Sequence, residues 1–317
     1  MFTIKQPSRI IFGKNTAYEF QFPKKSLVIT SPGAKSRNWF SYTGIDEKLV
    51  FDSVKPNPSM EIVEEIISLY QNLDFDYVIG IGGGSVLDVS KYVGFKLNKL
   101  KISVPTTFGS GSEITRISVL KINGKKKSFH DDGLISDISI IDSNFLIDTP
   151  HSVYRNSAID ACAQCSEAYD SKSGNIFTKF LCSKAFDCLE EGILNNSKEK
   201  LAFGSLLTGL GFGNSSTTLG HALSYPFSNE GIPHGHALAF TTTIAHKFNK
   251  SQFFGRFQNL VKKLDFPPIS LKQNLSDAAD IIITDRKHLD NNPIKITKKN
   301  IIYLLEIINQ NKTNNFS

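Results

Sequence analysis

A strand that runs directly into three consecutive glycines most constrains how this chain folds. The apolar run Tyr77–Ile81 leads into the glycines at positions 82–84, and Val86–Phe95 then has apolar residues at helical spacing. Glycines let a phosphate approach the backbone closely, and a helix N-terminus offers unpaired N–H groups and a partial positive charge. The alternative is a tight structural turn, because the glycine spacing differs from that of the usual dinucleotide fingerprint.

The first half of the chain repeats this alternation of strand and helix. Ser26–Thr30 and Lys101–Val104 are short apolar runs that end at turn residues, and both predict strands. Met60–Leu69 has apolar residues at helical spacing and predicts a helix. Strands that alternate with helices favour a doubly wound, Rossmann-like parallel sheet. We therefore predict an α/β nucleotide-binding domain over residues 1–149.

From residue 150 onward the pattern changes to helix after helix. Three segments carry helical apolar periodicity: Ser157–Tyr169, Phe177–Leu194 and Lys200–Tyr225. Pro226 and Pro233 are expected to bracket a loop, and a further helix is expected to begin near His234. We predict an all-helical domain over residues 150–317, and its polar last residues, 309–317, are expected to fray.

Composition and charge narrow the class of protein. The chain has 317 residues, of which 40% are hydrophobic and 21% charged, an ordinary balance for two globular domains. The net charge of +6 is mild, and no basic stripe with interleaved aromatics is present. This argues against nucleic-acid binding and fits anionic small molecules better. The lysine run Lys125–Lys127 follows Asn123 and Gly124, which predicts a solvated hairpin tip.

The sequence also bears on the cell compartment. No apolar run approaches the roughly 18 residues needed to span a membrane. Residues Met1–Asn15 lack the long apolar core of a signal peptide. We therefore expect a cytoplasmic protein without membrane segments, whose four cysteines stay reduced.

A second segment rich in glycine and hydroxyl groups follows the strand at Lys101–Val104. It spans Pro105–Thr115 and reads PTTFGSGSEIT. Its hydroxyls and glycines suit contacts to the ribose, pyrophosphate or amide groups of a ligand, and the alternative is an ordinary loop. Because ligands collect at the carboxyl ends of parallel strands, its place beside the glycine turn favours ligand binding.

Four side chains of the helical half could bind a divalent metal. Asp160 and Gln164 stand at i and i+4 and project from one helix face, while His221 and His234 follow later in the chain. One carboxylate, one amide oxygen and two imidazoles could bind a cation and leave a position open for substrate. The alternative is that each histidine is a core or surface residue.

A rival site consists of cysteines. Cys162 and Cys165 form a CxxC that could join Cys182 and Cys188 in a four-thiolate zinc site, or act as a redox pair. The unequal spacings and the position within a predicted helix favour small hydrophobic side chains instead.

Taken together and in this order, the motifs match a known family. The stretches GGGSVLDVSK (Gly82–Lys91), PTTFGSGSEIT (Pro105–Thr115) and GHALSYPFSNEGIPHG (Gly220–Gly235), with the Asp160 helix and the Asn57-Pro58 turn, resemble the iron-containing alcohol dehydrogenase family. The resemblance runs from about residue 8 to residue 305. It implies a dehydroquinate synthase-like architecture and a nicotinamide cofactor laid across the glycine turn.

The resemblance also implies site residues. Those expected along the cofactor are Ser31, Asn57, Gly82, Gly83, Gly84, Ser85, Asp88, Lys91, Thr106, Thr107, Ser112 and Thr115. The four metal-ligand positions of the family fall on Asp160, Gln164, His221 and His234. Fe²⁺ is the expected metal and Zn²⁺ the alternative.

Two departures from the family pattern are informative. The family usually has histidine where this chain has Gln164, and a second family histidine is replaced by Tyr225. This variant resembles the phosphonoacetaldehyde reductase branch, which implies reduction of phosphonoacetaldehyde to 2-hydroxyethylphosphonate. A neutral amide oxygen should also bind a transition metal less tightly than an imidazole does.

The choice of cofactor is predicted from the end of the first long strand. NAD-selective members carry an acidic residue where this chain has Ser31, so no carboxylate repels a 2′-phosphate. Lys35 and Arg37 lie just beyond and could pair with such a phosphate. NADPH is therefore expected over NADH, although both cations could be ordinary surface residues.

The implied reaction is hydride transfer to an aldehyde that the metal polarises, with His236 and Tyr225 as candidates for the proton relay. Possible cationic partners for a phosphonate are Arg116, Arg155, Lys172 and His236. The alternatives are a general short-chain alcohol or polyol dehydrogenase, a dehydroquinate-synthase-like cyclase, and a nucleotide-binding relative without catalysis. A homodimer is expected from base rates alone.

Overall fold

Six parallel strands form the sheet of the first half in this computed structural model, which describes residues 1–310. Their order across the sheet is β1-β8-β5-β4-β2-β3, and every neighbouring pair runs parallel. The strands are β1 (Arg9–Gly13), β2 (Ser26–Thr30), β3 (Val50–Phe51), β4 (Tyr77–Gly82), β5 (Leu100–Pro105) and β8 (Ile138–Asp142). The predicted parallel α/β sheet is confirmed.

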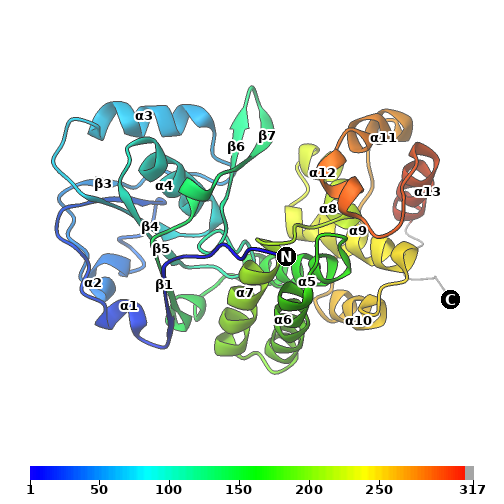
Figure 1. Cartoon of the computed structure of the whole chain (residues 1–317), viewed down its shortest axis with the longest axis horizontal. Coiled ribbons are helices and arrows are strands. Elements are labelled where there is room, and N and C mark those ends of the chain that lie inside the picture. Colours follow the sequence, from blue (N-terminus) through cyan, green and yellow to red (C-terminus); the bar gives the residue numbers. More distant parts are fainter. Residues whose placement is uncertain (311–317) are drawn as a thin grey trace.

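Helices cover both faces of this sheet. The short helices α1 (Thr16–Glu19) and α2 (Trp39–Thr43) lie on one face, and α3 (Met60–Tyr70) and α4 (Gly84–Lys96) lie on the other (Figure 1). Strand β2 (SLVIT) shows why: Leu27 and Ile29 belong to the apolar cluster under α3 and α4, and Val28 belongs to the cluster under α1 and α2. A strand buried on both faces reads as a continuous apolar run, as this one does.

The register of the strands brings three loops to one edge of the sheet. Thr30 pairs with Ile81, and Gly82 pairs with Pro105. The loops that follow β2, β4 and β5 therefore begin side by side at the carboxyl edge. Such an edge is where open α/β sheets bind their ligands.

An antiparallel hairpin projects from the sheet domain toward the top of Figure 1. It consists of β6 (Ile117–Ile122) and β7 (Lys125–His130). Its two turn residues, Asn123 and Gly124, have φ of 51° and 76°. Positive φ at both positions defines the type I′ turn that Asn-Gly favours. The hairpin predicted from this dipeptide is confirmed.

The second half of the described chain is helical. Its helices are α5 (His151–Asp170), α6 (Ile176–Leu194), α7 (Lys198–Phe212), α8 (Leu219–Asn229), α9 (His234–Asn249), α10 (Phe254–Lys263), α11 (Leu275–Ile283), α12 (Arg286–Asn291) and α13 (Lys298–Asn309). Helix α5 packs against α6, α7 and α9 and is the central element. Within residues 1–310, no helix is both long enough and apolar enough to cross a membrane. Of the residues expected to fray, 309–317, those after residue 310 lie outside the described part of the chain.

The two halves share one apolar core. Phe108, Ile114 and Ile141 of the first half belong to the same buried cluster as the helices of the second. Strand β8 ends at Asp142 and α5 begins at His151, so the change from strands to helices falls where the sequence pattern changes. The division into domains 1–149 and 150–317 stays a prediction.

The helix expected over Lys200–Tyr225 is wrong as a single element. Helix α7 ends at Phe212 and α8 begins at Leu219, because Ser216 adopts a left-handed conformation (φ 65°) and the Thr218 N–H donates to a carboxylate on α5 instead of continuing a helix. Pro226 was expected in a loop and instead lies inside α8. The helix continues past it because Phe227, the next residue, is fully buried in the core.

Candidate metal and cofactor site

Three ligand atoms from three helices meet at one point. Asp160 on α5, His221 on α8 and His234 on α9 each offer an atom, and these atoms lie within 4.8 Å of one another. Nε2 of His221 is 3.9 Å from Oδ1 of Asp160, and Nε2 of His234 is 4.0 Å from it. These separations are too long for direct hydrogen bonds, but they suit atoms that each lie about 2.0–2.2 Å from a shared cation. Across residues 1–310, no other group of three or more His, Cys, Asp or Glu side chains converges in this way.

Two buried polar atoms at this point have no hydrogen-bond partner among residues 1–310. Nε2 of His221 and Oε1 of Gln164 are buried and make no hydrogen bond. The amide nitrogen of Gln164 donates to Oδ1 of Asp160 at 3.0 Å, which places all four predicted ligands together. An unsatisfied buried polar group costs about 1–3 kcal/mol. The donor set and its unpaired atoms therefore fit a divalent cation.

The electrostatics of the cluster also favour a cation. Burial raises the pKa of Asp160 to about 7, although His221 and Gln164 oppose the shift. Burial, with the charge of His221, lowers the pKa of His234 well below its ordinary value, so that imidazole is neutral. A neutral imidazole is the form that binds metals, and a cation beside Asp160 would stabilise the carboxylate that burial disfavours. About one third of the His234 side chain stays exposed, which leaves the cluster open on one side.

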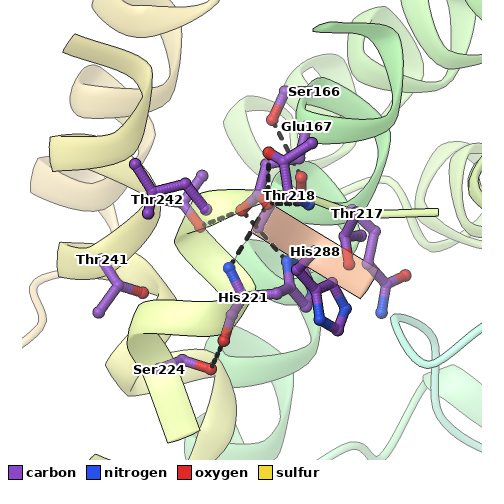
Figure 2. A network of polar contacts seen from close by, with 12 residues as sticks. Ser166, Glu167, Thr217, Thr218, His221, Ser224, Thr241, Thr242 and His288 are labelled. Carbon is purple, nitrogen blue, oxygen red and sulfur yellow. Dashed lines mark hydrogen bonds and ion pairs between the residues drawn. The ribbon is translucent and has the colours of Figure 1, made fainter. Parts of the chain in front are cut away.

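Glu167 was missed in the sequence and is central to the cluster. Its Oε1 lies 3.1 Å from Nδ1 of His221, and its Oε2 accepts from the N–H and the hydroxyl of Thr218 at 2.7 and 2.9 Å (Figure 2). A Cβ at Gly220 would lie 2.2 Å from Oε1, so only glycine lets the first turn of α8 approach so closely. Burial raises the pKa of Glu167, but His221 and the hydrogen bonds outweigh burial and lower it to about 2. The carboxylate thus fixes the Nδ1–H tautomer of His221 and directs Nε2 toward Asp160.

A spacing in the sequence could have revealed this residue. Asp160, Gln164 and Glu167 stand at i, i+4 and i+7, which is one face of a helix. The rest of that helix from Ala158 to Ala168 is almost wholly apolar and buried. A polar stripe on a buried helix needs a partner for every member, so it indicates a site.

His288 on α12 was also not predicted. Its ring stacks on the ring of His221, with centroids 6.3 Å apart and planes 12° apart, and its Nδ1 lies 2.7 Å from Oδ2 of Asp285. The ring of Tyr225, expected in the proton relay, lies 5.9 Å from that of His288. Burial strongly raises the pKa of the Tyr225 hydroxyl. Tyr225 therefore joins the layer of rings beside the metal cluster.

The other expected relay residue, His236, is not brought to the cluster. Its Nε2 lies 2.6 Å from the carbonyl oxygen of Pro267, and its ring lies against Phe266. The reason is helical geometry: residues at i and i+2 on α9 face different directions, so His236 points away from the side that His234 occupies.

The glycine turn and the second loop are in close contact at the carboxyl edge of the sheet. A Cβ at Gly83 would lie 3.1 Å from Oγ1 of Thr107, and one at Gly84 would lie 2.8 Å from the Ser110 side chain. Gly83 caps α4 without a side-chain hydrogen bond, so the first N–H groups of the helix are available to a ligand. This arrangement leaves space and donors for a phosphate, whose binding at the turn stays a prediction.

Further expected cofactor residues surround this turn. The Thr106 N–H donates to the carbonyl of Gly82 at 3.0 Å, which ties the two loops together. The Asn57 N–H donates to Oγ of Ser85 at 3.3 Å, and Ser31 directly follows β2 at the same edge. Their contacts with a cofactor stay predictions.

Asp88 and Lys91 lie behind the loop. Asp88 accepts from Oγ of Ser112 at 2.6 Å and from the Val119 N–H at 3.1 Å. Lys91 is fully buried and donates to the carbonyls of Ser112, Thr115 and Ile117. An ammonium group has three hydrogens, and here all three go to the backbone. The expectation that Lys91 contacts the cofactor directly is therefore corrected: it holds the loop in place.

The cysteines do not form the rival site. All four are free and buried, and Sγ of Cys165 contacts the carbonyl of Cys162 at 3.4 Å. Burial raises the pKa of Cys162, Cys165, Cys182 and Cys188. Thiols in this state are inert and pack as small hydrophobes, as the sequence favoured.

A parallel α/β sheet followed by a helical half that gathers a carboxylate and two imidazoles places the chain in the dehydroquinate synthase-like class of folds. Residues 7–143 match the family described as iron-containing alcohol dehydrogenase, and residues 155–285 match the C-terminal part of the Fe-containing alcohol dehydrogenase family. The chain belongs to the iron-containing alcohol dehydrogenase family.

Curated relatives are distant. The chain is 30% identical to 4-hydroxybutyrate dehydrogenase of Clostridium kluyveri over 237 residues, which are 65% of this chain and 64% of the relative. It is 27% identical to sulfoacetaldehyde reductase of Bilophila wadsworthia over 261 residues, 71% of this chain and 67% of the relative. The chain spans about three fifths of the length of the curated relatives that match most strongly.

Solved structures share the fold over nearly the whole chain. An iron-containing alcohol dehydrogenase from Thermotoga maritima superimposes with a TM-score of 0.88 at 22% identity, covering 98% of this chain and 100% of that one. Sulfoacetaldehyde reductase from Bifidobacterium kashiwanohense, solved in complex with NAD⁺, superimposes with a TM-score of 0.87 at 22% identity, covering 97% and 98%.

Proposed function

We propose that this chain is a metal-dependent oxidoreductase that uses a nicotinamide cofactor to reduce a small aldehyde to its alcohol. The observation that carries the proposal is the convergence of Asp160, His221 and His234, with Nε2 of His221 unpaired. Family membership supports the same class of reaction. In this proposal residues 1–149 bind the nucleotide, and residues 150–317 hold the metal and the substrate.

The two parts of the site face a common element. Lys126, on the hairpin, has its pKa lowered by burial and by Lys121, while Asp160 and Asp88 both oppose the shift. One carboxylate belongs to the metal cluster and the other lies behind the cofactor loop. Both carboxylates therefore act electrostatically on the same lysine, which fits a reaction between a cofactor and a metal-held substrate.

Each residue has a role in the proposal. Asp160, His221 and His234 would hold the metal, with Gln164 as fourth ligand, and Fe²⁺ is the proposed ion with Zn²⁺ as the alternative. When bound, the metal supplies Lewis acidity at the aldehyde oxygen and the cofactor supplies the hydride. Glu167 orients the ring of His221. The ring of His234 is oriented by Ser224, whose Oγ lies 3.4 Å from Nδ1 of His234. Of the two relay candidates, Tyr225 stays in the proposal because it lies beside the ring layer, and His236 is left out.

The proposed substrate is phosphonoacetaldehyde. The support is the replacement of two family histidines by Gln164 and Tyr225. Among the relatives, 4-hydroxybutyrate dehydrogenase and sulfoacetaldehyde reductase are named after compounds with an anionic end, which fits a phosphonate. Two alternatives remain: a general alcohol or polyol dehydrogenase of the same family, and a nucleotide-binding relative without catalysis.

One experiment tests these readings together. The purified protein is assayed for bound metal, and NADPH oxidation is followed with phosphonoacetaldehyde, sulfoacetaldehyde and propanal. We expect turnover of all three, with kcat/KM highest for phosphonoacetaldehyde. Asp160→Ala should lose metal and turnover together, while Asp280→Ala, which removes an exposed carboxylate of α11, should keep both. A metal-free but active Asp160→Ala enzyme contradicts the proposal, and equal turnover of all aldehydes favours the general dehydrogenase.

The preference for NADPH is a further part of the proposal. Ser31 leaves room for a 2′-phosphate, and Arg37 lies exposed beyond it, stacked 5.2 Å from the Trp39 ring. Lys35 is less available because it lies 3.4 Å from a carboxylate oxygen of Glu47. Arg37→Ala should therefore raise KM for NADPH and leave KM for NADH unchanged. The homodimer and the cytoplasmic location stay predictions.

A further inference from the structure

A cavity of about 370 Å³ lies where the two halves of the chain meet. Its lining includes Arg116, which directly precedes β6, His130 at the end of β7, and Lys287 on α12. Ser215 and Ser216, in the segment before α8, add hydroxyl groups. This volume lies within the range of small-molecule sites.

The cations of this cavity are poorly balanced by carboxylates. Arg116 Nη1 pairs with Asp132 at 2.8 Å, but Lys5, which also lines the cavity, pairs with the same carboxylate. The Lys287 ammonium donates to Nε2 of His130 at 2.6 Å, and the charge of Asp285, which pairs with His288, offsets part of its own. Burial and the charges of Lys287 and Arg116 lower the pKa of His130 to about 4, so its ring is neutral and accepts that hydrogen bond. The cavity therefore carries excess positive charge.

One lining residue of the cavity is a neighbour in the chain of a residue beside the metal cluster. Lys287 directly precedes His288, whose ring stacks on that of His221 (Figure 2). Lys287 itself stays exposed to solvent, so a ligand can reach it from outside. His288 therefore links Lys287, which lines the cavity, to the proposed metal ligand His221.

Other cations that the sequence offered as anion partners are engaged elsewhere. Arg155 donates to the carbonyl of Asp265 at 2.9 Å, and Lys172 donates to the carbonyl of Asp290 at 3.2 Å. The imidazole of His236 contacts the carbonyl of Pro267. None of these three lines the cavity. Of the four residues expected from the sequence, only Arg116 does.

We propose that this cavity binds the anionic end of the substrate, with Lys287 and Arg116 as its charged partners. The ligand class is a small aldehyde that carries a phosphonate, sulfonate or carboxylate group. The planar fork of Arg116 and the mobile ammonium of Lys287 approach such a group from two elements, so its oxygens can be bound from two sides. This inference rests on the proposed function and adds to it the residues that would select the substrate.

The experiment compares a charged with a neutral aldehyde in one pair of variants. Lys287→Met keeps the length of the side chain and removes its charge, and Arg286→Met makes the same change at the neighbouring, exposed position of α12. For Lys287→Met we expect KM for phosphonoacetaldehyde to rise about 10- to 100-fold, while kcat/KM for propanal stays within about twofold. Arg286→Met should change neither, and Lys287→Arg should restore most of the affinity for the charged aldehyde.

The outcomes separate this inference from the proposed function. Equal losses with both aldehydes, or no loss with either, overturn the anion site. If the unmodified protein turns over no aldehyde, the proposed function fails, and the cavity is then judged by calorimetric titration with methylphosphonate. Saturable binding that is lost in Lys287→Met and kept in Lys287→Arg supports the site. No binding, or equal binding in all variants, overturns it.

Discussion

Oε1 of Glu167 lies 3.1 Å from Nδ1 of His221, so a carboxylate buried in α5 sets the orientation of a proposed metal ligand on α8. The same carboxylate accepts from Thr218 and from the hydroxyl of Thr242 at 3.0 Å. Each of these partners can donate a hydrogen bond to the carboxylate. Glu167 thereby joins α5 to α8 and α9. The tautomer of His221 is therefore a consequence of how three helices pack.

Replacing Glu167 by glutamine should weaken metal binding. The amide NH₂ would face donors that now meet a carboxylate oxygen, so the ring of His221 would lose its partner or change its tautomer. Loss of such an outer partner typically costs about 10- to 100-fold in metal affinity. The dissociation constant is measured by competition with a chelator. Glu191→Gln, which alters an exposed carboxylate paired with Lys200, is the control, and an unchanged affinity in Glu167→Gln would mean that packing alone orients His221.

Replacing Gln164 by histidine should strengthen metal binding. The Gln164 side chain already lies against Asp160, and its buried Oε1 has no hydrogen-bond partner in the described part of the chain. An imidazole binds first-row transition metals more tightly than a neutral amide oxygen, so Gln164→His should lower the dissociation constant for Zn²⁺ on the order of tenfold. Gln164→Met, which keeps the length but offers no oxygen, should raise it. If neither variant differs from the native protein in chelator competition, Gln164 is not a ligand.

The elements that the sequence predicted well are those whose pattern is local. Ser26–Thr30 matches β2 to the residue, because a strand covered on both faces is apolar throughout. The hairpin followed from one dipeptide. The break between α7 and α8 could not be predicted in this way, since residues 215, 217 and 218 are buried polar groups whose partners come from α5 and α12. Only the tertiary contact shows that the helix stops there.

The same distinction applies to the site. Asp160, His221 and His234 were found because their side chains are of types that bind metals and their order matches the family. Lys287 was not predicted, because an exposed lysine in a short helix has no local pattern that marks it as a binding residue. Its proposed role depends on its contact with His130 of the hairpin, 157 positions away. His236 contacts the Pro267 carbonyl instead of the cluster, because residues two positions apart on α9 point in different directions.

Adding a methyl group at Gly83 should weaken cofactor binding selectively. A Cβ there would lie 3.1 Å from Oγ1 of Thr107, so the glycine turn and the second loop would have to separate by a few tenths of an ångström. We expect Gly83→Ala to raise the NADPH dissociation constant by about tenfold, measured by fluorescence titration, and to leave metal content unchanged. Gly255→Ala is the control, because a Cβ at Gly255 meets nothing within 4 Å. Equal NADPH affinity in both variants would show that the turn does not hold the cofactor.

The stability of the chain should depend on pH through Glu113, which lies in the second loop. Burial raises the pKa of this carboxyl to about 7 from an ordinary 4.5, against the opposing effects of its own N–H and of Lys91. The folded state therefore favours the protonated acid, and its stabilising effect is complete below pH 4.5 and is lost as the pH rises through 7. At about 1.4 kcal/mol for each pKa unit, the loss is at most roughly 3.5 kcal/mol.

Glu113→Gln removes this titration, because an amide keeps the size of the protonated acid and carries no charge at any of these pH values. Relative to the native protein, the variant should gain free energy of unfolding as the pH rises from 4.5 to 8, and the two should be nearly equal at pH 4.5. Urea denaturation at a series of pH values measures the free energy of unfolding of both proteins. The titration of all other groups cancels when one value is subtracted from the other. A flat difference for Glu113→Gln would mean that this carboxyl is ionised in the folded protein at neutral pH, with Lys91 as its counter-ion.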